Sequence, residues 1–374
     1  MARFWGTLLL VFGIPIPLLV AAVAFVAVRI GEVVPFAQAA RMQQADPEML
    51  WKGYRDVEDA RYKLACLDVA RPEILVMGES RMGQVRRQMF APYSFYNMAR
   101  LAYAMRTYSD LVRRFPAGYH PRVIVFTLDF FQFSPRFTAE RAEAMPDFTS
   151  TRREAWLNAF RDVLAELPKH PSLLFAGRHD PKYGRPILGL QAWLNSYGFR
   201  QDGSEHLAKQ WMEKVADPHM GEDPDAAQKV FFDAPEMGAD ETARFEEFTA
   251  LCREKGIALV GVQMPMYRPM IRRLETDPRY GVLADFRKHL AEGWFAKQGV
   301  LAFDYLDMPG YSDDPRYFWD PIHPNEPAIL AALAKAEADP RVQALLPKLD
   351  AAAIQASLEA DRKSDQHIYL YDKP

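Results

Sequence analysis

Cysteine is scarce in this sequence. Cys66 and Cys252 are the only two among 374 residues, which excludes a disulfide framework and a cysteine-rich zinc site. If the soluble part lies outside the cytoplasm the two could pair, and two separate buried thiols fit the sequence equally well.

A strong charge of either sign is also missing. The 46 Lys and Arg residues nearly balance the 49 Asp and Glu residues, for a formal net charge of −3. Nothing therefore draws the whole chain to nucleic acid, and no nucleic-acid partner is expected. Hydrophobic residues make up 49% of the chain and charged residues 25%, which excludes wholesale disorder, collagen and coiled coil.

One long apolar run stands out at the N-terminus. Residues 5–28 contain no charged side chain and are long enough to cross a hydrocarbon core of roughly 30 Å. The sequence predicts a retained transmembrane anchor over residues 1–30, with a kink at Pro15 and Pro17. A cleaved signal peptide is the alternative, but the run is too long and the small-residue pattern at residues 37–39 lies well beyond its end.

After a polar linker over residues 31–70, apolar β-branched segments alternate with helical patterns. The alternation predicts an α/β domain over residues 71–345 with a mostly parallel five-stranded sheet. Strands are expected at residues 74–78, 94–97, 123–128, 257–262 and 300–304. Helices are expected at residues 103–115, 241–255 and 283–297, the second ending at Gly256.

Residues 135–239 interrupt this alternation with polar, aromatic and proline-rich sequence and one helical pattern at 152–167. Such a length is too great for a connector, so the segment is expected to be an insertion that covers a site at the carboxyl edge of the sheet. Helical patterns also follow at 328–338 and 342–360, with a break at Pro347. Residues 346–374 are expected to form a C-terminal helical tail.

Ser80 directly follows the first expected strand, in Gly78-Glu79-Ser80-Arg81. A turn from strand to helix exposes a side chain at the edge where α/β folds carry out chemistry. A serine hydroxyl becomes a useful nucleophile when a base lies within hydrogen-bond reach and a third group orients that base. The alternative is that Ser80 simply caps a helix.

Asp320 and His323 form the partner signal, in a proline-bracketed turn after the last expected strand. A carboxylate three residues before a histidine can accept a hydrogen bond from Nδ1 and leave Nε2 to take a serine proton. The turn falls at the same sheet edge as Ser80. Among eight histidines one such spacing is near chance, so a surface turn histidine is the alternative.

The strand-G-x-S start and the D-x-x-H near the end resemble the SGNH (GDSL-type) hydrolase superfamily. The resemblance covers residues 70–336 outside the insertion. It implies a flavodoxin-like three-layer α/β/α sandwich in which Ser80 is the nucleophile, His323 the general base and Asp320 its orienting group.

The apolar N-terminal helix, the G-x-S-R start and the Y-G-x-x-x-D-G phrase at residues 197–203 resemble a membrane-anchored branch of that superfamily more closely. The branch includes the D-alanyl transfer protein of teichoic acid modification and the alginate O-acetylation proteins. These work beside a membrane-bound O-acyltransferase, which the resemblance implies as a protein partner.

In the superfamily the oxyanion donors are the amide of the serine, a glycine after the second strand and the asparagine of a G-x-N-D block after the third strand. The G-x-N-D block is absent here. A missing donor costs about 10²- to 10³-fold in rate. Asn97 and Arg81 are candidate substitutes, and Asp129 is a candidate to line the site. Alternatively, Asn97 caps its own turn, Arg81 binds substrate or a surface carboxylate, and Asp129 caps a helix or pairs with an arginine.

Together these features predict a membrane-anchored O-acyltransferase, acetyl being the favoured group, that acts on an exported or cell-envelope polysaccharide. The expected location is the cytoplasmic membrane, crossed once by residues 5–28, with the large domain in the periplasm. Neither a cofactor nor a metal is expected, since Asp313 and Asp314 have no histidine pattern nearby. A non-catalytic SGNH-like scaffold and an acetyl esterase are the alternatives.

Overall fold

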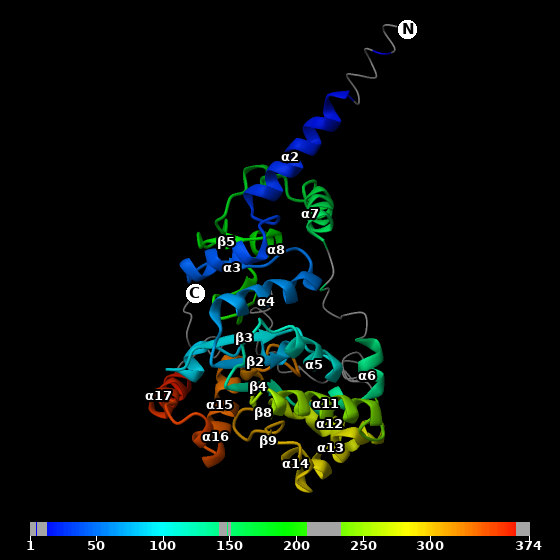
Figure 1. Ribbon diagram of the computed structural model, residues 1–374, viewed down its shortest axis with the longest axis vertical. Helices are drawn as coiled ribbons and strands as arrows, with labels where there is room; N and C mark the ends of the chain where they lie inside the picture. The colour runs from blue at the N-terminus through cyan, green and yellow to red at the C-terminus, as the bar shows by residue number, and fades with distance from the viewer. Residues whose placement is uncertain (1–4, 6–12, 142–147, 149–150, 208–232, 364–374) are drawn as a thin grey trace. The chain divides into compact units, whose positions relative to one another are not determined.

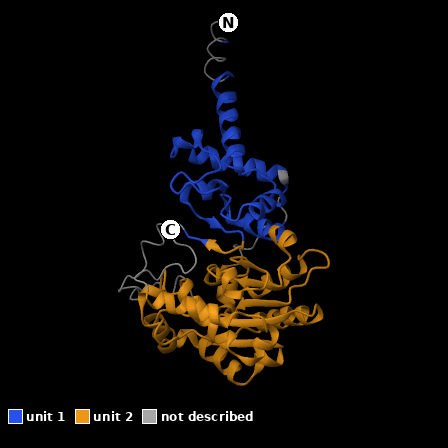
Figure 2. Cartoon of the chain, turned by 90° about the vertical axis from the view of Figure 1, so that its left-hand side faces the viewer, with its two compact units in different colours: residues 1–65, 146–201, 206–208 blue, residues 66–145, 202–205, 209–374 orange. Residues whose placement is uncertain are grey.

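The computed structural model describes residue 5, residues 13–141, residue 148, residues 151–207 and residues 233–363 (Figure 1). The chain divides into two compact units (Figure 2). The first unit comprises residues 1–65, 146–201 and 206–208, and the second comprises residues 66–145, 202–205 and 209–374. Most of the expected linker thus belongs to the same compact unit as a large part of the expected insertion.

A five-stranded parallel sheet forms the centre of the second unit (Figure 1). Its strands are β2 (Ile74–Gly78), β3 (Phe95–Ala99), β4 (Val123–Thr127), β8 (Ala258–Gln263) and β9 (Val300–Asp304). Every neighbouring pair is parallel, and the spatial order β3-β2-β4-β8-β9 is the 2-1-3-4-5 order of flavodoxin-like sheets. All five strands lie within two residues of their expected ranges.

Aromatic side chains cover one face of the sheet. Phe126 of β4 packs edge-on against Tyr108 of α5 (Met105–Arg113), with ring centroids 5.7 Å apart. It packs in the same way against Phe248 of α11 (Ala239–Glu254) at 5.4 Å. Each such pair adds about 0.5–1.5 kcal/mol to the burial of the rings themselves.

Aliphatic side chains cover the opposite face. Val125, one residue before Phe126 and so on the other side of the pleat, shares a core cluster with Ile329 of α15 (Glu326–Glu337) and Leu358 of α17 (Ala351–Arg362). Helices therefore flank both faces, as in a three-layer α/β/α fold. Because α17 contributes to this core, the expected C-terminal tail is partly integral to the domain; residues 364–374 lie outside the described part.

Shorter elements complete the second unit: η3 (Ser80–Met82), η4 (Arg87–Phe90), η5 (Phe130–Phe133), α6 (Pro135–Glu140), α12 (Arg268–Thr276), η8 (Pro278–Tyr280), α13 (Gly281–Ala291), α14 (Trp294–Lys297), η9 (Pro315–Tyr317) and α16 (Pro340–Leu345). The single helix expected over 283–297 is wrong, because Gly293 adopts φ = +72° and separates α13 from α14. The break expected at Pro347 is confirmed, since this residue lies between α16 and α17.

The first unit has a small core of its own. Its elements are α2 (Pro15–Arg29), α3 (Phe36–Ala45), β1 (Leu50–Trp51), η2 (Asp56–Glu58), α7 (Arg152–Glu166), η7 (Pro171–Phe175), β5 (Ile187–Leu188), α8 (Leu190–Asn195) and β6 (Gly198–Phe199); α4 (Asp59–Ala70) and β7 (Glu205–His206) run across the unit boundary. Trp51 stacks on Tyr62 with ring centroids 3.6 Å apart. Beside them, buried Lys52 forms an ion pair of 2.6 Å with Asp59.

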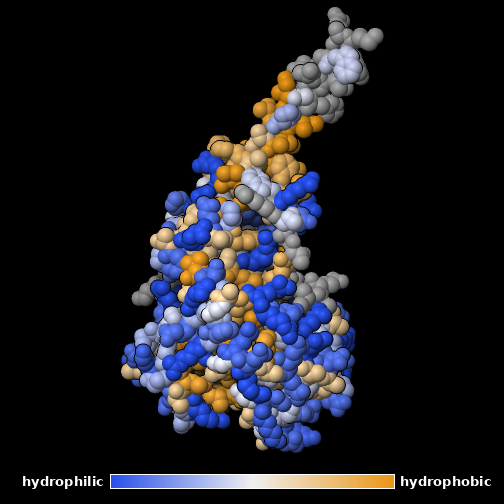
Figure 3. Space-filling view, in the orientation of Figure 1, coloured by the Kyte–Doolittle hydropathy of each residue, from blue (hydrophilic) through white to orange (hydrophobic). Residues whose placement is uncertain are grey.

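Helix α2 carries the apolar N-terminal sequence. Val23, Val26 and Ala27 are buried, whereas Ile16 and Leu18 are 52% and 64% exposed, and the apolar surface is visible in Figure 3. The two prolines expected to kink a longer helix lie at the start of α2. No helix within the described ranges has both the length and the apolar character needed to cross a membrane. Residues 6–12 of the expected span lie outside those ranges, so the anchor stays a prediction.

Cys66 and Cys252 are both buried and are not joined in a disulfide. Burial raises the pKa of the Cys252 thiol to about 12, so this side chain is protonated at neutral pH. An unreactive buried thiol is consistent with a packing role.

The D-G pair of the Y-G-x-x-x-D-G phrase lies against the edge strand β3. The Asn97 N–H donates to the Asp202 carbonyl at 2.8 Å. Gly203 adopts φ = +77°, and a Cβ at this position would lie 2.2 Å from the Asn97 carbonyl oxygen. Glycine is therefore required here both by the backbone conformation and by the close approach of β3.

Replacing Gly203 with Ala should destabilise the protein more than the same change at a glycine with equal backbone strain but open space. Gly310 is the matched control, because its φ is +84° and a Cβ added there would meet no neighbouring atom within 4 Å. We expect Gly310→Ala to lower the free energy of unfolding by about 1–2 kcal/mol. Gly203→Ala should cost at least twice as much in chemical denaturation, and equal losses would contradict the close approach.

Candidate active site

Ser80 occupies a sharp turn at the carboxyl end of β2. Gly78 adopts φ = +149°, and a Cβ there would lie 2.3 Å from Thr127 Oγ1 of the neighbouring strand. Glu79 is extended and is the N-cap of η3, which makes Ser80 the first residue of that helix. The alternative in which Ser80 is the N-cap is therefore wrong. Its own N–H precedes the hydrogen-bonded turn and has no partner within the helix.

The structure brings Ser80, His323 and Asp320 into one hydrogen-bonded chain. Ser80 Oγ lies 2.7 Å from His323 Nε2, and His323 Nδ1 lies 2.7 Å from Asp320 Oδ2. The carboxylate can only accept, so Nδ1 carries a proton and Nε2 is left to accept from the serine hydroxyl. The side chains of His323 and Asp320 remain 27% and 31% exposed, so the chain is open to solvent.

The histidine turn is fixed by backbone contacts at both of its ends. Asp320 Oδ1 accepts from the N–H groups of Ile322 and His323, each at 2.9 Å. The Trp319 N–H donates to the His323 carbonyl at 2.9 Å and closes the turn. Asn325 then caps α15, its side chain accepting from Ala328 N. The local sequence thus sets the orientation of the imidazole before any partner binds.

The charges of His323 and Asp320 stabilise each other. Burial alone would raise the pKa of Asp320, but attraction to His323 and hydrogen bonds from its ring and from two backbone N–H groups lower it to about 2. Burial would lower the pKa of His323, yet Asp320, and more weakly Glu79, outweigh it and raise this pKa above 6.5. The arrangement therefore favours the imidazolium that forms when His323 accepts a proton.

Arg81 is fully buried and ties several loops together. Its guanidinium forms an ion pair with Asp129, and neither side chain is exposed. Nε donates to the Ile322 carbonyl at 3.0 Å, and Nη2 donates to the carbonyls of Met264 and Pro265. Of the roles considered for Arg81, carboxylate pairing is the one found, and the carboxylate is buried rather than on the surface.

Asp129 and Glu79 share the environment of Arg81. Burial raises the pKa of Asp129, Arg81 lowers it, and the neighbouring Glu79 carboxyl raises it again, so that the net direction is upward. Asp129 Oδ2 and Glu79 Oε1 accept no hydrogen bond from any described residue. Burial and the neighbouring carboxyl group thus outweigh the attraction to Arg81 and favour the protonated form of Asp129. Asp129 belongs to the support of the site rather than to its surface.

Asn97 is fully buried and faces the turn that follows Ser80. Its side-chain amide donates to the Met82 carbonyl at 2.8 Å and to the Val85 carbonyl at 2.9 Å, while its oxygen accepts from Ala99 N at 2.7 Å. Both amide hydrogens are therefore engaged. Asn97 shapes the turn instead of supplying an oxyanion donor, which matches the turn-capping alternative.

Arg100 and Glu205 also support this region, and no sequence motif pointed to them. Arg100 holds φ = +71°, a conformation in which glycine is far more common. Its N–H lies 3.4 Å from the Glu79 carbonyl, and its guanidinium pairs with Glu205 at 2.5 Å. The Glu205 N–H donates to the Gly83 carbonyl at 2.8 Å, so that residues 202–205 brace the loop after Ser80.

The described residues and the comparisons with known proteins bear on what the site could hold and what the chain is related to. Among the described residues, no group of three or more His, Cys, Asp or Glu side chains is placed to hold a metal ion. In comparisons with known proteins, no family model, no curated protein and no solved structure matches the chain.

The raised pKa of His323 can be measured by following its imidazole resonances with pH in ¹H–¹⁵N NMR, assigned with His323→Gln. We expect a value above 6.5 in the wild type and a lower value in Asp320→Asn, because the neutral amide removes the attraction to the imidazolium. Asp339→Asn is the control, since Asp339 pairs with exposed Arg341. Equal values in wild type and Asp320→Asn would contradict the described pair.

Proposed function

We propose that this chain is a membrane-anchored serine acyltransferase that transfers an acyl group, acetyl in the first place, to an exported or cell-envelope polysaccharide. The observation that carries the proposal is the hydrogen-bonded chain from Ser80 through His323 to Asp320. Serine, histidine and aspartate in this order form the arrangement that activates a serine hydroxyl for acyl transfer. The resemblance to SGNH hydrolases supports the same roles.

In the proposed reaction, His323 Nε2 takes the Ser80 Oγ proton while Oγ attacks the acyl carbonyl carbon. The tetrahedral intermediate collapses, the donor leaves with the proton from His323, and the acyl group remains as an ester on Ser80. A sugar hydroxyl then attacks this ester, giving its proton to His323, and Ser80 recovers a proton when the product leaves. Asp320 holds the imidazole in the required tautomer throughout.

The Ser80 N–H is the oxyanion donor that the geometry supports, because it begins η3. Asn97 and Arg81 are engaged elsewhere, because they donate to backbone carbonyls. An enzyme whose oxyanion hole has one donor fewer turns over about 10²- to 10³-fold more slowly. We therefore propose that the protein turns over soluble esters slowly, unlike a general acetyl esterase.

The exposed apolar side chains of α2 support the membrane anchor. We propose that residues 5–28 cross the cytoplasmic membrane once, with the large domain in the periplasm. A tethered domain meets an acyl donor that a membrane-bound O-acyltransferase presents at the bilayer surface. The partner and the polysaccharide acceptor are proposed from the resemblance to the anchored branch.

A non-catalytic scaffold is the second candidate, and a specific observation favours it. Both residues considered as substitute oxyanion donors serve the structure of the loops instead. A protein with this fold could then bind polysaccharide or a membrane acyltransferase without forming an ester. The two candidates differ in whether Ser80 reacts.

Covalent labelling of Ser80 separates these candidates. The purified protein is exposed to a serine-directed phosphonate or an activated acetyl ester, and intact-protein mass spectrometry follows the adduct. We expect one adduct on the wild type, no adduct on Ser80→Ala and labelling about 10²- to 10⁴-fold slower on His323→Ala, which lacks the base. Ser357→Ala is the control, because this serine lies on α17 and its hydroxyl donates to the Ala353 carbonyl.

A folded wild-type protein that forms no adduct, or an adduct that persists in Ser80→Ala, would contradict the enzymatic proposal. When the acetyl adduct forms, adding an oligosaccharide acceptor distinguishes the transferase from an esterase. The transferase predicts acyl sugar in excess over free acid.

A further inference from the structure

Glu337 is a buried carboxyl group that the Ser80 site does not use. It is the last residue of α15 and is 8% exposed. Neither Oε1 nor Oε2 accepts a hydrogen bond from any described residue. A buried polar atom without a partner costs about 1–3 kcal/mol, and more when it is charged, so this side chain requires an explanation.

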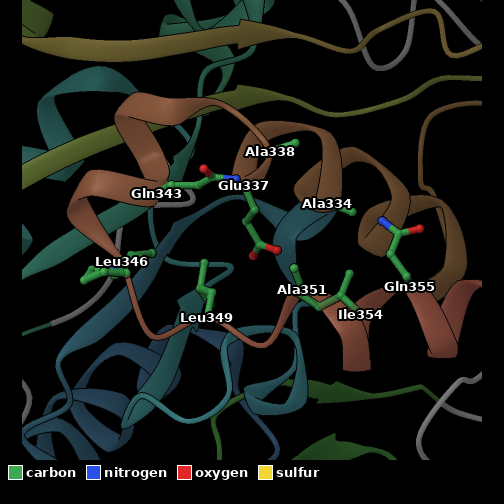
Figure 4. A pocket seen from close by; sticks show the side chains of 10 residues that line it. Ala334, Glu337, Ala338, Gln343, Leu346, Leu349, Ala351, Ile354 and Gln355 are labelled. Atoms are coloured by element: carbon green, nitrogen blue, oxygen red, sulfur yellow. The ribbon is translucent and has the colours of Figure 1, made fainter.

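The carboxyl group points into a cavity of about 360 Å³ formed by α15, α16, the following loop and α17 (Figure 4). Figure 4 shows it between Ala351 on one side and Leu349 on the other. The walls are mainly apolar, and Gln343 and Gln355 are the polar residues that line it besides Glu337. We call this cavity the Glu337 pocket. Its volume falls within the range of small-molecule sites, roughly 300–1,000 Å³.

The electrostatics of the Glu337 pocket favour a cation. Burial is the cause that raises the pKa of Glu337 well above its ordinary value. The carbonyl end of the twelve-residue helix α15 adds a partial negative charge, which stabilises cations and not anions. A positive group entering the pocket would therefore find the negative end of a helix and a buried carboxyl group that can release its proton to form a carboxylate.

Most charged residues on the surrounding elements pair with other residues or are exposed. Asp339 and Arg341, at the start of α16, pair with each other. Asp350 accepts from Ala353 N at the start of α17. The remaining charged residues of these elements are exposed Lys335, Lys348, Glu359 and Arg362, Glu326, which pairs with Arg86, and Asp361, which is buried. Burial alone accounts for the raised pKa of the Glu337 carboxyl group, so no cation of these elements neutralises the carboxylate.

We propose that the Glu337 pocket binds a small aliphatic primary amine, with its ammonium group on the Glu337 carboxylate and its carbon chain against the walls formed by Leu346, Leu349 and Ile354. The ammonium donates to Oε1 and Oε2, which satisfies both unpartnered oxygens. Such charge-assisted hydrogen bonds are about twice as strong as neutral ones. The apolar walls contribute about 0.8 kcal/mol for each buried methylene.

Binding is coupled to the loss of one proton. Below its pKa Glu337 is neutral, so an arriving ammonium ion displaces the carboxyl proton to solvent and keeps its own three protons. The affinity should therefore rise as the pH increases toward the pKa of Glu337, about tenfold for each pH unit, and level off above it. A neutral ligand such as an alcohol should show the opposite trend or none.

Glu337 makes folding less favourable at high pH, because there the buried carboxyl group loses its proton and becomes charged. Its pKa is higher in the folded than in the unfolded chain, so its stabilising contribution is complete below pH 4.5 and is lost as the pH rises through the folded value. Glu337→Gln keeps the shape without the charge and should raise the melting temperature at pH 8 but not at pH 4. The variant is thus expected to fold well enough for binding measurements.

The test is isothermal titration calorimetry of the full chain with n-butylammonium chloride at pH 7 in two buffers of different ionisation enthalpy. We expect saturable binding with release of protons, an affinity at least about tenfold weaker in Glu337→Gln, and wild-type affinity in Glu359→Gln, which alters an exposed glutamate of α17. Under the same conditions, 1-butanol should bind more weakly than butylammonium.

Equal butylammonium binding by wild type and Glu337→Gln would overturn the inference, as would 1-butanol binding as tightly as the amine. Absence of saturable amine binding to the folded wild type would overturn it as well. The pocket is independent of the Ser80 chemistry, so these outcomes leave the acyltransferase proposal unchanged. Ser80→Ala should bind butylammonium like the wild type.

Discussion

The buried ion pair between Arg81 and Asp129 is the interaction on which the rest of the site depends. Asp129 follows β4, and the carbonyls of Met264 and Pro265 that also bind Arg81 follow β8. The same guanidinium binds the Ile322 carbonyl in the histidine turn. One side chain, next to Ser80 in sequence, therefore joins the ends of two strands to the loop that carries His323.

This arrangement explains why the Ser80–His323 contact is already short. Two charges removed from water are costly to bury, and their attraction offsets that cost only when the geometry is good and the remaining donors are satisfied. Arg81 meets this condition through three backbone carbonyls. Asp129 meets it less fully, because its second oxygen accepts no hydrogen bond from any described residue. Burial and the neighbouring Glu79 carboxyl group raise the pKa of Asp129.

The sequence was sufficient for the sheet because each strand is a short apolar run buried on both faces, and this local pattern has few other outcomes. It was also sufficient to bring Ser80 and His323 to one edge, since the carboxyl ends of parallel strands meet there. It was not sufficient for Arg81 or Arg100. Their roles depend on carbonyl groups and carboxylates far away in the chain, which no local spacing encodes.

The sequence patterns also did not predict the division of the chain into two compact units. Residues 31–65 have a polar average, yet Lys52 is neutralised within a folded core, so polarity did not mean a linker. The division of the helix at Gly293 depends on a single backbone angle. In both cases the structure depends on a contact or a backbone conformation that the hydrophobic periodicity of the sequence does not encode.

The importance of the buried pair can be measured as the free energy of unfolding of Arg81→Met compared with Arg341→Met in chemical denaturation. We expect a loss of about 3–5 kcal/mol for Arg81→Met, because Asp129 is left buried without its cation. For Arg341→Met we expect about 0–1 kcal/mol, because Arg341 is exposed and solvent screens its pair with Asp339. If Arg81→Met does not fold, Asp129→Asn provides the same comparison. Small and equal losses would contradict the central role of the buried pair.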